Sequence, residues 1–136
     1  MGNTQNSVKK LNFEDVQFII KTNHKWLIIN TLGENDQKCL IKNTMNYENE
    51  EKTINNLIEN GNNTNNIMIY GRNCNDETIG KKYNQLASLG FCEIQVYMGG
   101  MFEWLVLQDI YGDDQFPTTF KELDILKYKP DKLLLF

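Results

Sequence analysis

Arginine is nearly absent from this sequence of 136 residues, because Arg72 is the only arginine among 14 basic residues. Histidine occurs once, proline occurs twice, and the formal net charge is −4 at pH 7. A protein that binds nucleic acid needs a basic face, which a mildly acidic chain does not favour. We therefore expect no nucleic-acid partner. The hydrophobic content of 40% is ordinary for a soluble globular domain.

Cysteine is also scarce, and the three cysteines are Cys39, Cys74 and Cys92. Their odd number and wide separation favour neither a disulfide framework nor a zinc site. Reduced thiols in a cytoplasmic protein are the simplest interpretation. We predict no metal site and no cofactor, and we expect Cys39 and Cys92 to be small buried residues of the core. No apolar run approaches the ~20 residues of a membrane-spanning helix.

The first residues nearly match a signal for N-myristoylation at Gly2, but the hydroxyl residue, Ser7, comes one place late. An ordinary disordered terminus is the alternative, and the imperfect motif favours it. If Gly2 is acylated, a single acyl chain would give only weak membrane association. Lys9 and Lys10 would then add some attraction to anionic lipid.

Hydrophobic periodicity predicts strands and helices that alternate along one domain. Apolar runs predict strands at 26–29, 39–41, 67–70 and 94–97. Helical spacing predicts helices at 13–20, 47–60, 79–89, 101–110 and 121–126, with Gly90 as a C-terminal cap. This alternation implies a mostly parallel sheet. We expect a flexible N-terminal segment at 1–11, an α/β domain at 12–120, and a C-terminal extension at 121–136 that packs on the domain or on a partner.

The polar turn after the strand at 67–70 is the candidate binding loop. Ligands of such sheets usually bind beyond the carboxyl ends of the strands, where backbone N–H groups and a helix N-terminus attract anions. Gly71 allows close approach of a ligand. Arg72 suits bidentate anion binding, although an exposed, solvated arginine is an equal alternative. The other residues of the predicted loop are Asn73, Cys74, Asn75 and Asp76, of which Asp76 is most simply a helix cap.

Several motifs in order resemble the rhodanese homology domain over roughly residues 12 to 118. They are the buried strand Ile67–Tyr70 closed by Gly71, then Leu89-Gly90-Phe91, Val96-Tyr97, Gly99-Gly100 and Trp104. The resemblance implies a three-layer α/β sandwich in which helices flank a mostly parallel central sheet.

The departures from this family concern its chemistry. The family's nucleophilic cysteine, which carries a persulfide, is replaced by Gly71, so sulfur transfer has no nucleophile. Related phosphatases place an arginine where this chain has Glu77, and a carboxylate there repels phosphate. Inactive members of the family commonly serve as interaction modules. The resemblance therefore implies a pseudoenzyme that recognises a protein partner, or a small anion, at the loop Gly71–Asp76.

Two alternatives belong to other classes of protein. Cys74 could replace the missing cysteine in a sulfurtransferase or thiol redox enzyme, because a helix N-terminus can lower the pKa of a thiol. Asp76 and Glu77 oppose this, since nearby negative charge disfavours a thiolate. The chain could also be a structural component of a larger assembly. Its apolar tail, Leu133 to Phe136, is suited to docking on the domain or on a partner.

Overall fold

Four short parallel strands form the central sheet in the computed structural model, which describes residues 8–134. In spatial order the strands are β1 (Lys9–Leu11), β4 (Ile94–Tyr97), β3 (Ile67–Tyr70) and β2 (Leu27–Asn30). All three neighbouring pairs run parallel, as crossover connections through helices require. The predicted parallel sheet is therefore confirmed.

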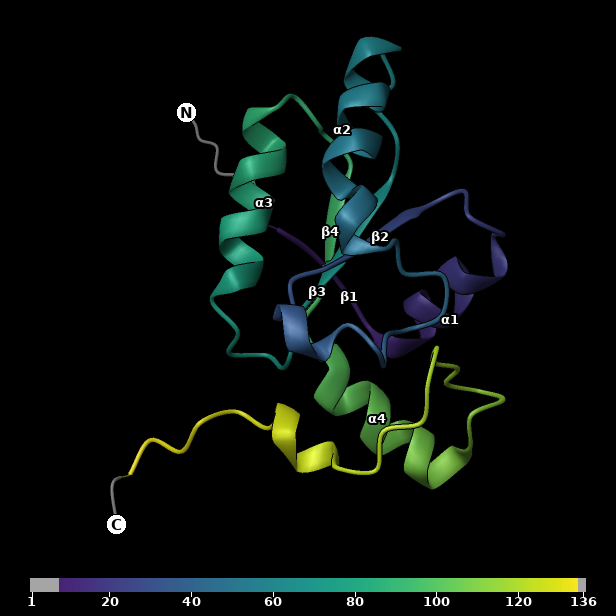
Figure 1. Cartoon of the computed structure of the whole chain (residues 1–136), viewed down its shortest axis with the longest axis vertical. Coiled ribbons are helices and arrows are strands. Elements are labelled where there is room, and N and C mark those ends of the chain that lie inside the picture. The colour runs from purple at the N-terminus through teal and green to yellow at the C-terminus, as the bar shows by residue number, and fades with distance from the viewer. Residues whose placement is uncertain (1–7, 135–136) are drawn as a thin grey trace.

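Helices cover both faces of this sheet (Figure 1). Helices α1 (Phe13–Lys21) and α4 (Gly100–Tyr111) lie on one face, while α2 (Glu50–Glu59) and α3 (Thr78–Ser88) lie on the other. The central strand β3 is buried on both sides: Met68 and Tyr70 pack in the α1–α4 layer, and Ile67 and Ile69 pack in the α2–α3 layer. Such alternation follows from the two-residue repeat of a strand. The predicted three-layer α/β sandwich is confirmed.

Local sequence signals explain where two of the helices start or stop. At α1, the Asn12 side chain accepts the Asp15 N–H, and the Asp15 carboxylate accepts the Asn12 N–H, which forms a capping box. Helix α3 ends before Gly90, whose φ of 101° is costly for any residue with a Cβ. The predicted cap at Gly90 is confirmed.

Three local predictions that concern residues before the C-terminal extension are wrong. Lys9–Leu11 is not flexible but forms β1, because its backbone pairs with β4 at the edge of the sheet. Residues 39–41 form no strand beyond an isolated bridge between Ile41 and Thr118. Cys92 is exposed, whereas Cys39 is buried as expected. Gly2 lies outside the described residues.

The C-terminal extension packs on the domain. The expected helix at 121–126 is replaced by a short 3-10 turn, Ile125–Tyr128. The side chain of Tyr128 is fully buried in the same core as Trp104 and Tyr70. By contrast, Leu133 and Leu134 are exposed, and Phe136 lies outside the described residues. Within residues 8–134, no helix is both long and apolar enough to span a membrane.

Gly100 lies where the start of α4 closely approaches the backbone of the loop after β3. It has a φ of 65°, and a Cβ there would lie 2.6 Å from the Gly71 carbonyl oxygen and 2.9 Å from the Asn73 backbone nitrogen. Gly100→Ala should therefore lower the free energy of unfolding by about 1–3 kcal/mol in chemical denaturation. The matched control is Gly80→Ala in α3, where a Cβ meets nothing within 4 Å. That variant should gain about 0.4–1 kcal/mol, and equal losses in both would contradict the account.

Candidate functional site

The loop Gly71–Glu77 connects β3 to α3 at the carboxyl end of the sheet and lies against the N-terminus of α4. The Met101 N–H donates to the Gly71 carbonyl at 3.0 Å, and the Phe102 N–H donates to the Arg72 carbonyl at 2.9 Å. The first turn of a helix has backbone donors without partners inside the helix. In α4, the loop itself satisfies two of them, so the loop backbone is held in place.

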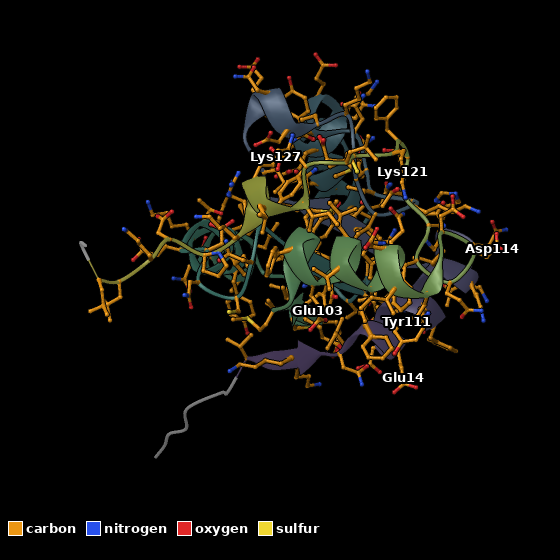
Figure 2. The ribbon with its side chains drawn as sticks, turned by 90° about the horizontal axis from the view of Figure 1, so that it is seen from below. Glu14, Glu103, Tyr111, Asp114, Lys121 and Lys127 are labelled. Atoms are coloured by element: carbon orange, nitrogen blue, oxygen red, sulfur yellow. The ribbon has the colours of Figure 1, made fainter. Side chains whose placement is uncertain are left out.

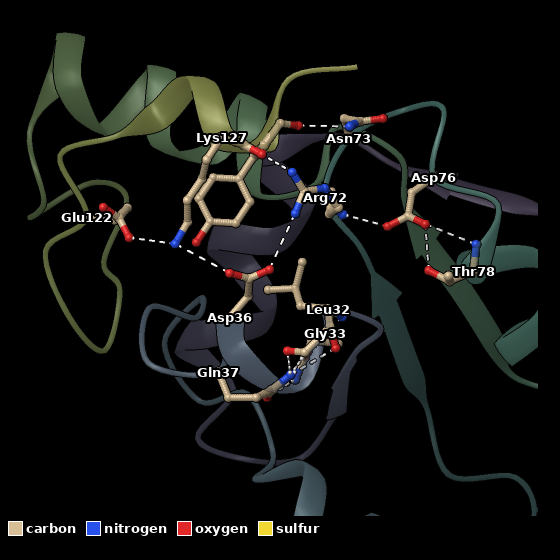
Figure 3. Close-up of polar contacts among 12 residues, drawn as sticks. Leu32, Gly33, Asp36, Gln37, Arg72, Asn73, Asp76, Thr78, Glu122 and Lys127 are labelled. Carbon is tan, nitrogen blue, oxygen red and sulfur yellow. Dashed lines mark hydrogen bonds and ion pairs between the residues drawn. The ribbon is translucent and has the colours of Figure 1, made fainter. Parts of the chain in front are cut away.

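The Asp76 carboxylate lies inside this loop (Figure 3). Its Oδ2 accepts the Arg72 N–H at 2.9 Å, and its Oδ1 accepts both the Thr78 N–H at 3.0 Å and the Thr78 hydroxyl at 2.6 Å. Asp76 thus binds the first amide of α3, close to the cap role that the sequence predicts. The carboxylate supplies from within the chain the negative charge that a loop of N–H donors attracts.

A side chain at Gly71 would have to displace this carboxylate. A Cβ at Gly71 would lie 2.4 Å from Asp76 Oδ2 and 2.7 Å from Thr31 Oγ1, both far inside normal contact distance. Thr31 is in turn bonded to the Thr78 hydroxyl at 2.8 Å. The position at which the resemblance places a nucleophile is therefore filled by polar groups of neighbouring segments.

Arg72 uses its guanidinium within the chain. Its Nη1 lies 3.4 Å from Asp36 Oδ2, and its Nη2 donates to the carbonyl of Lys127 in the C-terminal extension. The side chain remains 38% exposed, so it is neither fully solvated nor enclosed. The sequence offered two roles for Arg72, anion binding or a solvated side chain. In the structure its guanidinium binds an anionic group of the chain itself, the carboxylate of Asp36 in the 3-10 turn Glu34–Asp36.

Asn73 fixes the extension to the loop at a second point. Its side chain is buried, its Nδ2 donates to the Tyr128 carbonyl at 2.8 Å, and its Oδ1 accepts the Asn75 N–H at 2.9 Å. Figure 3 shows Arg72 and Asn73 side by side, each facing a main-chain carbonyl of the extension. Together the two side chains clamp residues 127 and 128.

Lys127 links the extension to two carboxylates. Its Nζ lies 3.4 Å from Asp36 Oδ1 and 2.9 Å from Glu122 Oε1. The hydrogen bond with Glu122 raises the pKa of Lys127, and the same bond lowers the pKa of Glu122. Burial raises the pKa of the neighbouring Tyr128 phenol, so this hydroxyl stays neutral. Because the ion pairs are partly exposed, each adds little stability by itself.

Comparison with solved structures identifies the architecture. The yeast protein Ygr203w, described as a homolog of single-domain rhodanese and of the Cdc25 phosphatase catalytic domain, aligns with a TM-score of 0.59 at 18% identity. The alignment covers 87% of this chain and 91% of that one. This chain has a rhodanese-like fold. The rhodanese-like domain of Alr3790 from Anabaena aligns with a TM-score of 0.58 at 18% identity, over 96% of this chain and 90% of that one.

A third structure agrees with this assignment of a rhodanese-like fold. The yeast single-domain sulfurtransferase RDL2 aligns with a TM-score of 0.54 at 21% identity, covering 85% of this chain and all of that one. No family model and no curated protein matches the sequence. The fold expected from the motifs between Ile67 and Trp104 is thus confirmed at the level of structure.

The outer part of the rhodanese-like loop remains open to solvent. Cys74, Asn75 and Glu77 are exposed. They lie near a shallow depression of about 440 Å³, which is lined by Asn75 and Glu77 among others and is bordered by Lys81, Lys129 and Asp131. The Cys74 Sγ lies 3.7 Å from Asn75 Oδ1. Among residues 8–134, no group of three potential ligands could hold a metal ion.

The contribution of the Asp76 carboxylate to the folded loop can be measured as a change in the free energy of unfolding. Asp76→Ala leaves the N–H groups of Arg72 and Thr78 without their acceptor, so the free energy of unfolding should fall by about 1–3 kcal/mol. Glu77→Ala is the matched control, because this neighbouring carboxylate is exposed. It should change stability by less than about 0.5 kcal/mol in the same urea titration. Similar values for the two variants would show that Asp76 does not organise the loop.

Proposed function

We propose that this chain is a non-catalytic rhodanese-like module that recognises a protein partner through the exposed side of the loop after β3. The observation that carries the proposal is the Asp76 carboxylate, 2.4 Å from where a Gly71 side chain would start. A group that fills the nucleophile's position leaves no site for a persulfide. The loop is held in place by its own contacts.

The remaining catalytic options are less well supported. Phosphate transfer needs positive charge around the transferred group, yet an exposed carboxylate, Glu77, stands at the place of the phosphatase arginine. For the thiol enzyme based on Cys74, the thiol lies 3.7 Å from Asn75 Oδ1, an amide oxygen that cannot act as its general base. Neither arrangement supplies an activated nucleophile.

A protein partner is better supported than a small anion. The Asp76 carboxylate already accepts the backbone N–H of Arg72, and the Asp36 carboxylate pairs with its guanidinium. An added anion would therefore be repelled by two carboxylates. The exposed depression, by contrast, offers both signs of charge, from Lys81 and Lys129 on one hand and Glu77 and Asp131 on the other. An open surface with both signs of charge can form the polar rim of a protein interface.

The absence of sulfur transfer is the first test of this proposal. Wild-type protein should move no sulfur from thiosulfate to cyanide above the buffer rate. Gly71→Cys should stay at background as well, because its Cβ collides with Asp76 Oδ2, and it should lose about 1–3 kcal/mol of stability. Turnover by the wild-type protein that disappears in Cys74→Ser would contradict the proposal and support the thiol enzyme.

The second test concerns the partner surface. Charge reversal by Lys81→Glu should reduce the amount of any partner that wild-type protein captures from its host, by about tenfold, since like charges at an interface oppose association. Lys52→Glu on α2 is the matched control, because this lysine is exposed and lies outside the depression. Both variants should keep the wild-type melting temperature. Equal capture by wild type, Lys81→Glu and Lys52→Glu would place the interface elsewhere.

A further inference from the structure

The C-terminal segment over the loop, residues 122–129, is here called the strap. Figure 2 shows it beside α4, with Lys127 above the helix and the chain continuing away from the domain. Its contacts with the loop use main-chain atoms: the carbonyls of Lys127 and Tyr128 accept hydrogen bonds from Arg72 and Asn73. A main-chain carbonyl is present at every residue, so the loop holds the strap as it would hold another peptide.

Only one side chain of the strap is deeply inserted. Tyr128 is fully buried, while Leu123 is 83% exposed and Leu126 is 63% exposed. The attachment therefore consists of the Tyr128 anchor, partial packing of Ile125 against the core, two carbonyl contacts and the ion pair of Lys127 with Asp36. Segments with few buried contacts open at lower free energy than the strands of the core.

We propose that the strap is an internal substitute for a partner's peptide, and that the site under it binds a peptide with two consecutive main-chain carbonyls and an aromatic side chain. Arg72 and Asn73 bind the carbonyls, and the pocket of Tyr128 receives the ring. The inference goes beyond the proposed function, because it adds a second, covered site with its own class of ligand and its own regulation. Strap and partner exclude each other, so the closed state is autoinhibited.

The chemistry of the site fits such a peptide. Donors on two adjacent loop residues match the spacing of adjacent carbonyls, and Asp36 beside them attracts a basic residue at the place of Lys127. The cations of Arg72 and Lys127 lie 5.5 and 5.1 Å from the centre of the Tyr128 ring, within the range of cation–π attraction. An aromatic residue preceded by a lysine is therefore the preferred pair.

Amide hydrogen exchange on the full chain tests whether the strap opens separately. The Lys127 and Lys129 amides, which bond to Asp124 and Leu126 within the strap, should exchange about a hundredfold faster than the amides of β3. Asn73→Ala should accelerate the strap amides by about another tenfold and leave β3 unchanged. Lys81→Ala, which lacks a contact with the Tyr128 carbonyl, should change neither. Strap and β3 amides that exchange at one common rate in every variant would overturn the inference.

A peptide of residues 121–132 tests the ligand class. It should not bind wild-type protein, whose own strap occupies the site at high effective concentration. It should bind Tyr128→Ala, in which the pocket is empty, as measured by fluorescence anisotropy. The same peptide with Tyr128→Ala, or a protein that also carries Asn73→Ala, should bind about tenfold more weakly.

Lack of peptide binding by a Tyr128→Ala protein with a wild-type circular dichroism spectrum would overturn the ligand class. If this variant does not fold, the exchange rates of the wild-type protein decide the matter. Failure of either measurement leaves the exposed surface around Lys81 untouched, because that surface is tested by charge reversal. Conversely, loss of the Lys81 interface would leave the strap result standing.

Discussion

The structure around the candidate site depends on one carboxylate. Asp76 turns back into its own loop and accepts N–H donors from Arg72 and Thr78, so a negative charge is built into the place where anion-binding loops hold a ligand. Its position requires glycine at residue 71, since any Cβ there would collide with Oδ2. The loop carbonyls are then free to accept the first amides of α4, with Gly100 in close contact. The need for glycine at residue 71 and the order of the loop thus depend on the same carboxylate.

The loop is occupied from two sides. Asp76 fills its interior, and the C-terminal extension contacts it from one side through Arg72 and Asn73. Tyr128 anchors this extension in the core, whereas Leu123 and Leu126 beside it stay exposed. What remains accessible is the edge with Cys74 and Asn75, which is polar and open. Under the proposed non-catalytic role, these contacts hold the chain together at the loop where the resemblance places the family's chemistry.

Sequence patterns predicted the elements whose signals are local. Runs such as Ile67–Tyr70 predict a buried strand, and the strand–loop–helix order located the candidate loop. The edge strand Lys9–Leu11 escaped prediction because backbone pairing, and not an apolar pattern, stabilises it. The partners of Arg72 also escaped: Asp36 is 36 residues away, and a Lys127 carbonyl has no residue-specific signal. Only tertiary packing decides which hydrogen-bond donors of the loop find acceptors elsewhere in the chain.

The most direct test of the account is an NMR titration of the full chain with thiosulfate and, separately, with phosphate. Because the Asp76 carboxylate already occupies the loop, the amide resonances of residues 71–77 should not move at millimolar concentrations of either anion. Asp76→Ala, which removes the internal charge, should show larger shifts at the same amides. Saturable shifts confined to the loop of the wild-type protein would contradict the account, because they would show that the loop still binds an external anion.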